Sequence, residues 1–390
     1  MVNILKSRNL FPVYLFSFLF AFHSALPTYI NSSFLNVFIS ERLLGVVYSI
    51  ASAITILLFF LAPYILKKFG NYRVCLSLII LEISALAVLT ISQTSFWLLT
   101  SFIISLITIP FIYLSLDVFL EGFSVNKETG RVRGIYLTLA NLAWIFSPFI
   151  SSMILTNGDY WKVYLTALIF LIPILFILLT NLKNFKDSKY EVTSFKNTSN
   201  KIWKDKNIKN IFLTNFLLHF FYSWMTIYTP LYLHKYVGFS WTDIGIIFGI
   251  MLLPFVFVQF PLGKIADEKY GEKEILSFGF IILAVSTIVL FFIPKDSSLW
   301  FWAIILFITR IGAGSIEVMS DTYFFKKVDS LDANIISFFR IARPLAYMLG
   351  PLIATVCLSL VGAEGGYLFL ILGVIMFSGL WFSLRLKDTK

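Results

Sequence analysis

The chain has 390 residues, of which 58% are hydrophobic and only 13% are charged. A soluble globular domain carries about 25% charged residues, so this composition excludes a soluble enzyme or binding module and predicts a membrane protein. The two cysteines form no disulfide framework and no zinc-binding pattern. The net charge of +10 is explained below by the distribution of basic residues along the chain.

Twelve apolar runs are long enough to cross about 30 Å of hydrocarbon as helices. Six lie near residues 10–30, 43–66, 74–93, 96–120, 133–156 and 161–181. After a polar stretch, six more lie near residues 210–233, 242–265, 275–293, 299–325, 334–360 and 366–385. We therefore predict an all-α membrane protein with an N-terminal six-helix bundle over 1–182, a cytoplasmic linker over 183–209 and a C-terminal six-helix bundle over 210–390.

Basic residues cluster in alternate loops between the predicted helices. With both termini in the cytoplasm, 24 of the 31 Lys and Arg residues lie on the inner side, and only Arg42, Lys162, Lys235 and Lys295 lie outside. An excess of positive charge on the inner side is the usual pattern of membrane proteins. The sequence thus predicts a multi-pass protein of the cell membrane, plasma or inner, with both termini cytoplasmic. The net charge of +10 is therefore explained by the membrane topology and not by nucleic-acid binding.

The two halves of the chain are similar at an offset of about 200 residues, which is the pattern of an internal structural repeat. The matches are Leu43–Ile50 with Asp243–Ile250, Lys67–Gly70 with Glu268–Gly271, Asp117-x3-Glu121 with Glu317-x3-Asp321, and Pro148 with Pro351. Four matches in the same order predict two pseudo-symmetric bundles.

These residues resemble the major facilitator superfamily of secondary transporters over essentially the whole chain. The loop Gly263–Gly271 is similar to the Gly-x-x-x-Asp-Arg-x-Gly signature of that family, with one residue added. The resemblance implies that Asp267 latches the cytoplasmic ends of neighbouring helices, because helix N-termini attract carboxylates. The first-half copy departs from the signature, with Pro63 and Lys67 where the Gly and the Asp stand. The family fold has twelve helices around a central site.

Three charged residues interrupt the tenth apolar run. Arg310, Glu317 and Asp321 are seven and four residues apart, which places them on one face of a helix. Each charge costs about 3 kcal/mol at the centre of a bilayer, so such residues face the protein interior or a watery path. Arg340 and Arg343 lie three apart in the next run. Since the tenth helix lines the cavity in the resembled family, Arg310, Glu317, Arg340 and Arg343 are predicted to bind substrate. The alternative is a purely structural ion-pair cluster.

Further candidates come from other predicted helices, of which the resemblance places the first, fourth and seventh at the cavity and the third at the periphery. Aromatic and amide side chains suited to a small organic solute are Asn141, Trp144, Trp224 and Tyr228. Proton coupling needs a carboxylate or an imidazole whose protonation changes with hydration, and the candidates are Glu317, Asp117, His23 and Glu82. A structural role is the alternative for His23 and Glu82.

A cytoplasmic gate is predicted at the inner ends of the helices, because partly hydrated ion pairs break at modest cost. Its residues are Asp267, Asp117, Glu121, Arg131, Arg133 and Asp321.

The leading hypothesis is a secondary active transporter with alternating access. It is coupled to protons and moves a small polar or anionic, metabolite-like or sugar-like solute. Multidrug efflux is an alternative, favoured by the 18% aromatic content, and a non-transporting sensor of the same fold is another. No Walker loop, nucleophile elbow or Cys/His metal spacing occurs, so no enzyme activity, catalytic residue, metal or cofactor is predicted. The expected partners are the solute, protons and the lipid bilayer; no nucleic acid is expected, and the protein is predicted to be a monomer.

Overall fold

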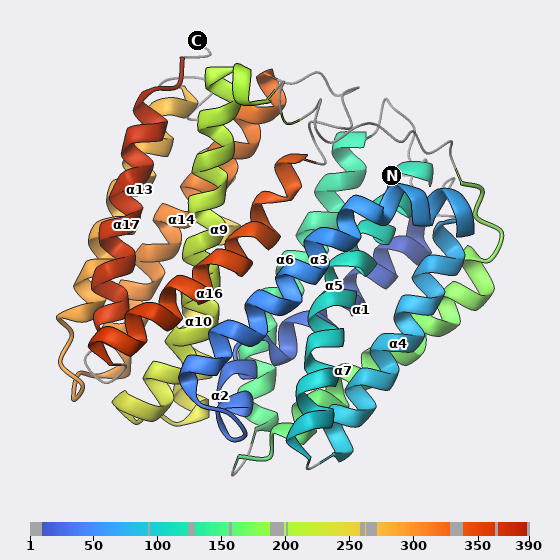
Figure 1. The fold of residues 1–390 in the computed structure, drawn as a ribbon, viewed down its shortest axis with the longest axis horizontal. Helices are drawn as coiled ribbons and strands as arrows, with labels where there is room; N and C mark the ends of the chain where they lie inside the picture. Colours follow the sequence, from blue (N-terminus) through green and yellow to red (C-terminus); the bar gives the residue numbers. More distant parts are fainter. Residues whose placement is uncertain are drawn as a thin grey trace. The chain divides into compact units, whose positions relative to one another are not determined.

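The computed structural model describes residues 10–92, 94–123, 129–155, 158–187, 199, 202–257, 262, 271–327, 338–362 and 366–387. Within these residues the chain is helical and contains no β-strand (Figure 1). It forms two compact units. Unit 1 comprises Met1–Phe38 and Ile50–Val192, and unit 2 comprises Ile39–Ser49 and Thr193–Lys390.

Unit 1 is built from the helices of the first half of the chain. They are α1 (Leu10–Thr28), the short α2 (Asn31–Asn36), α3 (Glu41–Phe69), whose first turns count with unit 2, α4 (Asn71–Ile91), α5 (Ser95–Phe123), α6 (Thr129–Ile154) and α7 (Tyr160–Ile177), which continues as the π-helix η2 (Leu178–Leu182). α4 packs against α5 and α7, and α1 packs against α6 and α7. An apolar core from α1, α4, α5, α6 and α7 fills the centre of this unit.

Unit 2 contains the helices of the second half. They are α9 (Lys206–Tyr232) with its π-helical extension η3 (Leu233–Val237), α10 (Trp241–Leu252), α11 (Pro254–Phe257), α13 (Glu272–Phe291), α14 (Leu299–Lys327), α16 (Ala342–Val361) and α17 (Tyr367–Leu384). α13 packs between α14 and α17, and α9 contacts α14, α16 and α17 (Figure 1). α9 therefore brings its side chains to both α14 and α16.

Each predicted apolar run contains a helix, which confirms the all-α membrane fold. Eight helices among the described residues are long and apolar enough to cross a bilayer, and the total of twelve spans remains a prediction. The predicted run 242–265 is interrupted, since α10 ends at Leu252 and α11 begins at Pro254. Proline lacks the N–H group that would continue the helix but fits the first turn of a new one.

Polar caps fix where two helices of unit 2 begin. The Asp205 side chain accepts hydrogen bonds from the backbone N–H groups of Asn207 and Ile208, so α9 starts inside the predicted linker. Ser240 and Asp243 form a reciprocal capping box at the start of α10. Such caps satisfy N–H groups that have no partner within the helix, and each contributes about 1 kcal/mol.

Corresponding glycines precede α4 and α13. Gly70 and Gly271 have φ angles of 77° and 80°, which glycine adopts far more readily than other residues. This agreement supports the sequence match between the two halves at these positions. After Gly70, the backbone N–H of Asn71 donates to Asp187 Oδ1 at 2.9 Å. After Gly271, the buried Glu272 pairs with Lys326 at the end of α14. Both helix N-termini thus meet a carboxylate, as the helix dipole favours.

α13 and α14 approach each other closely at two glycines. A Cβ atom added at Gly312 would lie 2.7 Å from the backbone nitrogen of Leu283 and 2.8 Å from the carbonyl oxygen of Gly279. These are backbone atoms, which cannot swing aside as a flexible side chain can. Gly312 lies between Arg310 and Glu317 on α14, so this contact also fixes which way the charged face of the helix points.

We expect Gly312→Ala to lower the free energy of unfolding by about 1–3 kcal/mol, because the added methyl group forces the two helices apart. The measurement is the thermal unfolding temperature of the purified protein in detergent. Ile304→Ala is the control, since Ile304 is 55% exposed on the same helix. An unchanged unfolding temperature for Gly312→Ala would contradict the close approach.

Candidate functional site

Arg310 is buried in the middle of α14, with only 2% of its surface exposed. Its guanidinium group lies over the rings of Phe221 and Tyr222 on α9, 5.4 and 5.3 Å from their centroids. Among the described residues no hydrogen bond or ion pair reaches this side chain, and its Nε atom is a buried donor without a partner. Cation–π contacts contribute about 0.5–2 kcal/mol, whereas removing a charge from water costs several. Arg310 is therefore an incompletely satisfied buried cation.

Glu317 lies two turns further along the same face of α14. Its Oε2 atom accepts a hydrogen bond from the Tyr222 hydroxyl at 3.2 Å. The charges of Arg343 and Arg310 both act on this carboxylate. Tyr222 thus contacts the buried cation with its ring and the neighbouring anion with its hydroxyl. Helices α9, α14 and α16 together form a polar cluster, called here the α14 cluster: Arg310, Glu317, Tyr222 and Arg343.

The charged face becomes more accessible along α14. Arg310 is buried, Glu317 is part-buried and Asp321 is exposed. Arg340 acts electrostatically on Asp321, and both Arg340 and Arg343 are exposed. The structure thus places Arg340 and Arg343 within electrostatic range of the carboxylates on α14. Among these charged residues, Arg310 alone is removed from solvent.

Two residues of this region were absent from the predicted site. Tyr222 bridges Arg310 and Glu317, and His219 lies one turn before it on α9, with the two ring centroids 6.0 Å apart. The Nδ1 atom of His219 is buried and has no hydrogen-bond partner among the described side chains and backbone. Tyr222 sits in the run Phe220–Tyr222, where the sequence gives no periodicity that distinguishes one aromatic ring from the next. The spacing of His219 and Tyr222, three apart on one helical face, was the available signal.

Trp224 and Tyr228 are buried against α16. Trp224 Nε1 donates to the carbonyl oxygen of Gly350 at 2.7 Å, and the Tyr228 hydroxyl donates to that of Pro351 at 3.3 Å. Both also line a small, mainly apolar pocket together with Tyr232. Their polar atoms therefore hold the backbone of α16, and their predicted contact with a solute stays a prediction.

The predicted residues on α5 and α6 lie in unit 1. Asn141 and Trp144 are part-buried on α6, Asp117 is part-buried on α5, and Glu121 is exposed near the end of α5. The side chains of Arg131 and Arg133, and the whole of Asp267, lie outside the described residues. The cytoplasmic gate remains a prediction.

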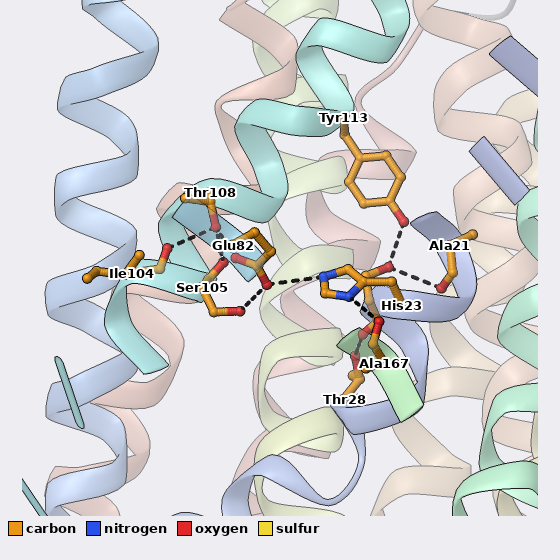
Figure 2. Close-up of polar contacts among 10 residues, drawn as sticks. Ala21, His23, Thr28, Glu82, Ile104, Ser105, Thr108, Tyr113 and Ala167 are labelled. Carbon is orange, nitrogen blue, oxygen red and sulfur yellow. Dashed lines mark hydrogen bonds and ion pairs between the residues drawn. The ribbon is translucent and has the colours of Figure 1, made fainter. Parts of the chain in front are cut away.

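A second polar cluster lies in the core of unit 1 and joins two predicted proton sites (Figure 2). His23 Nε2 on α1 lies 3.1 Å from Glu82 Oε1 on α4, and His23 Nδ1 lies 3.1 Å from the carbonyl oxygen of Ala167 on α7. From α5, Ser105 Oγ donates to Glu82 Oε1 at 2.7 Å, and Thr108 Oγ1 hydrogen bonds with Glu82 Oε2. His23 and Glu82 are 1% and 0% exposed. Four helices therefore converge on one buried acid–imidazole pair.

We expect Tyr222→Phe to weaken solute binding by at least about tenfold, because it removes one hydrogen bond to a charged group, worth about 1.5–3 kcal/mol, while the ring over Arg310 remains. The measurement is the concentration of solute at half-maximal uptake into proteoliposomes. Tyr367→Phe is the matched control, since Tyr367 is 42% exposed and outside the α14 cluster. Equal values for Tyr222→Phe and wild type would exclude a role of the hydroxyl in binding.

Comparison with known proteins gives both a family and a fold. The family model described as Major Facilitator Superfamily matches residues 10–340. A structure of a mutant of the nucleoside transporter NupG superposes with a TM-score of 0.79 at 12% sequence identity, covering 97% of this chain and 99% of that chain. A POT family transporter in complex with 5-aminolevulinic acid superposes with a TM-score of 0.78 at 14% identity, covering 97% of this chain and 95% of that chain. No curated protein sequence matches at a significant level.

Proposed function

The chain belongs to the Major Facilitator Superfamily and is a membrane transporter rather than an enzyme, and from this premise we propose that it moves a small anionic or polar solute by alternating access, driven by protons. We place it in the cell membrane with both termini cytoplasmic, in agreement with the distribution of its basic residues, and we propose that it is a monomer, as the family resemblance implies. The solute site that we propose is the α14 cluster.

The observation that carries this proposal is the incomplete satisfaction of Arg310. A guanidinium group offers several donors in a planar fork, which matches a carboxylate or a phosphate in a bidentate contact. The rings of Phe221 and Tyr222 contact the guanidinium group without accepting a conventional hydrogen bond, so its N–H donors are left for another partner. A carboxylate or phosphate group of a solute meets that requirement.

The neighbouring charges restrict the remainder of the solute. Glu317 repels a second negative charge near Tyr222, whereas Arg343 on α16 attracts one. A solute with one anionic group and further hydroxyl, amide or amino groups therefore fits the α14 cluster better than an apolar cation does. The similar folds include a nucleoside transporter and a transporter bound to 5-aminolevulinic acid, so nucleosides and amino acids belong in the first set of compounds to test.

The proposal is tested by uptake of radiolabelled compounds into proteoliposomes that contain the purified protein. The panel contains small carboxylates, phosphorylated metabolites, zwitterionic amino acids, nucleosides and sugars, together with the methyl ester or amide of each acid. We expect uptake of an acid but not of its neutral derivative, and accumulation that an imposed pH gradient increases and a proton ionophore abolishes.

Three other results would contradict this assignment. Transport of lipophilic cations alone would indicate multidrug efflux. Uptake that does not respond to a pH gradient would exclude proton coupling. Folded protein that transports no compound faster than empty liposomes do would favour the non-transporting sensor.

A further inference from the structure

We propose that Glu82, together with His23, is the site at which this carrier binds its coupling proton, and that the Thr108 hydroxyl turns between Glu82 and the carbonyl oxygen of Ile104 as the proton arrives and leaves. This inference rests on the proposed proton coupling and assigns it to a cluster of unit 1 (Figure 2), whereas the α14 cluster belongs to unit 2.

The hydrogen bond to Ala167 fixes which nitrogen of His23 carries a proton. The Ala167 carbonyl oxygen is only an acceptor, so Nδ1, 3.1 Å away, must be the donor. Nε2 then faces Glu82 Oε1 at 3.1 Å. A bare Nε2 and a bare carboxylate would place two acceptors against each other in a buried site. One proton must therefore lie between them, either on the imidazole or on the carboxyl group, and the pair is electrically neutral in both forms.

The other oxygen of Glu82 is arranged to take a second proton. Thr108 Oγ1 contacts Glu82 Oε2, and the same hydroxyl lies 3.0 Å from the carbonyl oxygen of Ile104. A threonine hydroxyl has one hydrogen and can accept as well as donate. When Oε2 is unprotonated, Thr108 donates to it. When Oε2 carries a proton, the carboxyl O–H donates to Thr108 and the threonine hydrogen turns to Ile104.

Proton binding to Glu82 changes only the positions of hydrogen atoms and breaks no bond between heavy atoms. A hydronium ion of the aqueous phase gives its proton to Glu82 Oε2 and is left as water, a new O–H bond forms, and the hydroxyl hydrogen of Thr108 rotates to another acceptor. Ser105 keeps donating to Oε1 and His23 keeps both of its hydrogen bonds. The net charge of the pair changes from zero to +1. Because each form satisfies its hydrogen bonds, the cost of changing the charge in a buried site is reduced.

The surroundings of the pair contain few other charges. On α4 the nearest charged residue is Arg73, nine residues from Glu82, and on α5 it is Asp117, nine residues from Thr108; at 1.5 Å per residue each is about 13 Å along its helix. On α7, Lys162 pairs with Asp159. The sequence of α6 from Thr138 to its end contains no charged residue.

One more ionisable side chain lies close to the pair. The Tyr113 hydroxyl hydrogen bonds with Ser24, the residue after His23, at 2.8 Å, and the Phe20 ring stacks on the imidazole. The added charge is therefore shared mainly among His23, Glu82 and their hydrogen-bond partners. A change in these bonds acts on α1, α4, α5 and α7 together, which is what a coupling site in a helical bundle requires.

The first experiment detects the proton directly. Infrared difference spectra between low and high pH are recorded on the full-length protein in lipid, with protons as the only added ligand. We expect wild type to show the carbonyl stretch of a buried carboxyl group that protonates, and we expect Glu82→Gln to lack it. Thr108→Val should shift its midpoint, and Thr108→Ser should restore it. Asp159→Asn is the matched control, since it removes an exposed carboxylate and should leave the buried band unchanged.

The second experiment separates proton coupling from structure. Glutamine keeps the size of Glu82 and mimics its protonated form. With the radiolabelled solute that the uptake panel identifies, we expect Glu82→Gln to retain solute exchange, which needs no net proton movement, and to lose accumulation driven by a pH gradient. Thr108→Val, which removes a hydroxyl but preserves shape, should show the same separation to a smaller degree.

Several outcomes would overturn the inference. Normal gradient-driven accumulation by Glu82→Gln would exclude Glu82 as the proton site. A purely structural pair would give two results together. Glu82→Gln and Thr108→Val would both lose exchange, accumulation and thermal stability in parallel, and wild type would show no pH-dependent carboxyl band. Failure of the proposed proton coupling can be told apart from failure of this inference. Without proton coupling, solute uptake by the wild-type protein would not respond to an imposed pH gradient.

Discussion

Replacing Arg310 with methionine should abolish accumulation of the solute and at the same time raise the stability of the protein. Truncating a buried, charge-assisted contact costs about 2–5 kcal/mol, which lowers solute affinity by at least about 30-fold at 1.4 kcal/mol per factor of ten. The same substitution removes a buried cation for which the described residues supply no anionic hydrogen-bond partner. We expect the free energy of unfolding to rise, because the desolvation cost of an unpaired buried ion, several kcal/mol, exceeds the about 0.5–2 kcal/mol that its cation–π contacts contribute.

This opposite movement of activity and stability distinguishes a binding residue from a structural one. Solute uptake and thermal unfolding are measured on the same preparation. Arg385→Met is the control, since Arg385 stacks on Trp381 at 3.7 Å at the end of α17, outside the α14 cluster. If Arg310→Met lowers the unfolding temperature, Arg310 stabilises the fold, and its assignment to the solute is wrong.

Removing one partner of the buried pair in unit 1 should be more harmful than removing both. His23→Leu leaves the Glu82 carboxylate buried with only two hydroxyl donors, and breaking a buried charged pair typically costs about 3–5 kcal/mol. In the double variant His23→Leu/Glu82→Leu no charge remains, and Thr108 still has the Ile104 carbonyl as an acceptor. We expect the double variant to recover most of the lost free energy of unfolding.

The recovery is measured as a double-mutant cycle of thermal unfolding temperatures in detergent, with Glu82→Leu as the fourth member. Leu26 and Leu86, one turn away on the same helices, supply the control variant Leu26→Ala/Leu86→Ala, which should show additive losses because the two side chains carry no shared charge. An additive result for the His23 and Glu82 variants would mean that the two groups do not interact energetically.

The helices could be predicted from sequence because a bilayer imposes a simple requirement. A segment that crosses it needs about 20 apolar residues and must satisfy its own backbone hydrogen bonds. The break at Leu253 was missed because apolarity continues through it, and only the missing N–H group of Pro254 marks the interruption. The start of α9 at Lys206 was placed too late, because capping by Asp205 extends a helix into polar sequence that apolarity cannot detect.

The charged face of α14 could be predicted from spacing alone, since residues seven and four apart must share a helical face. Its partners could not. Tyr222 is 95 residues from Glu317 along the chain, and the contact exists only because α9 packs on α14. The same holds for His23 and Glu82, which are 59 residues apart. The sequence identified each as an isolated candidate, and the common core that α1, α4, α5 and α7 form turned them into one pair.

The hydrogen bond from Asn71 to Asp187 assigns the residues just after η2 to unit 1. Asp187 accepts a hydrogen bond at the start of α4, where Asn71 is buried. Position 70 has no room for a side chain, since a Cβ atom on Gly70 would lie 2.6 Å from Asp187 Oδ2. A fragment that ends before this aspartate would deprive α4 of its cap. Anyone wishing to divide the gene for co-expression of two complementary pieces, or to insert a fluorescent reporter between them, should choose a position beyond residue 187.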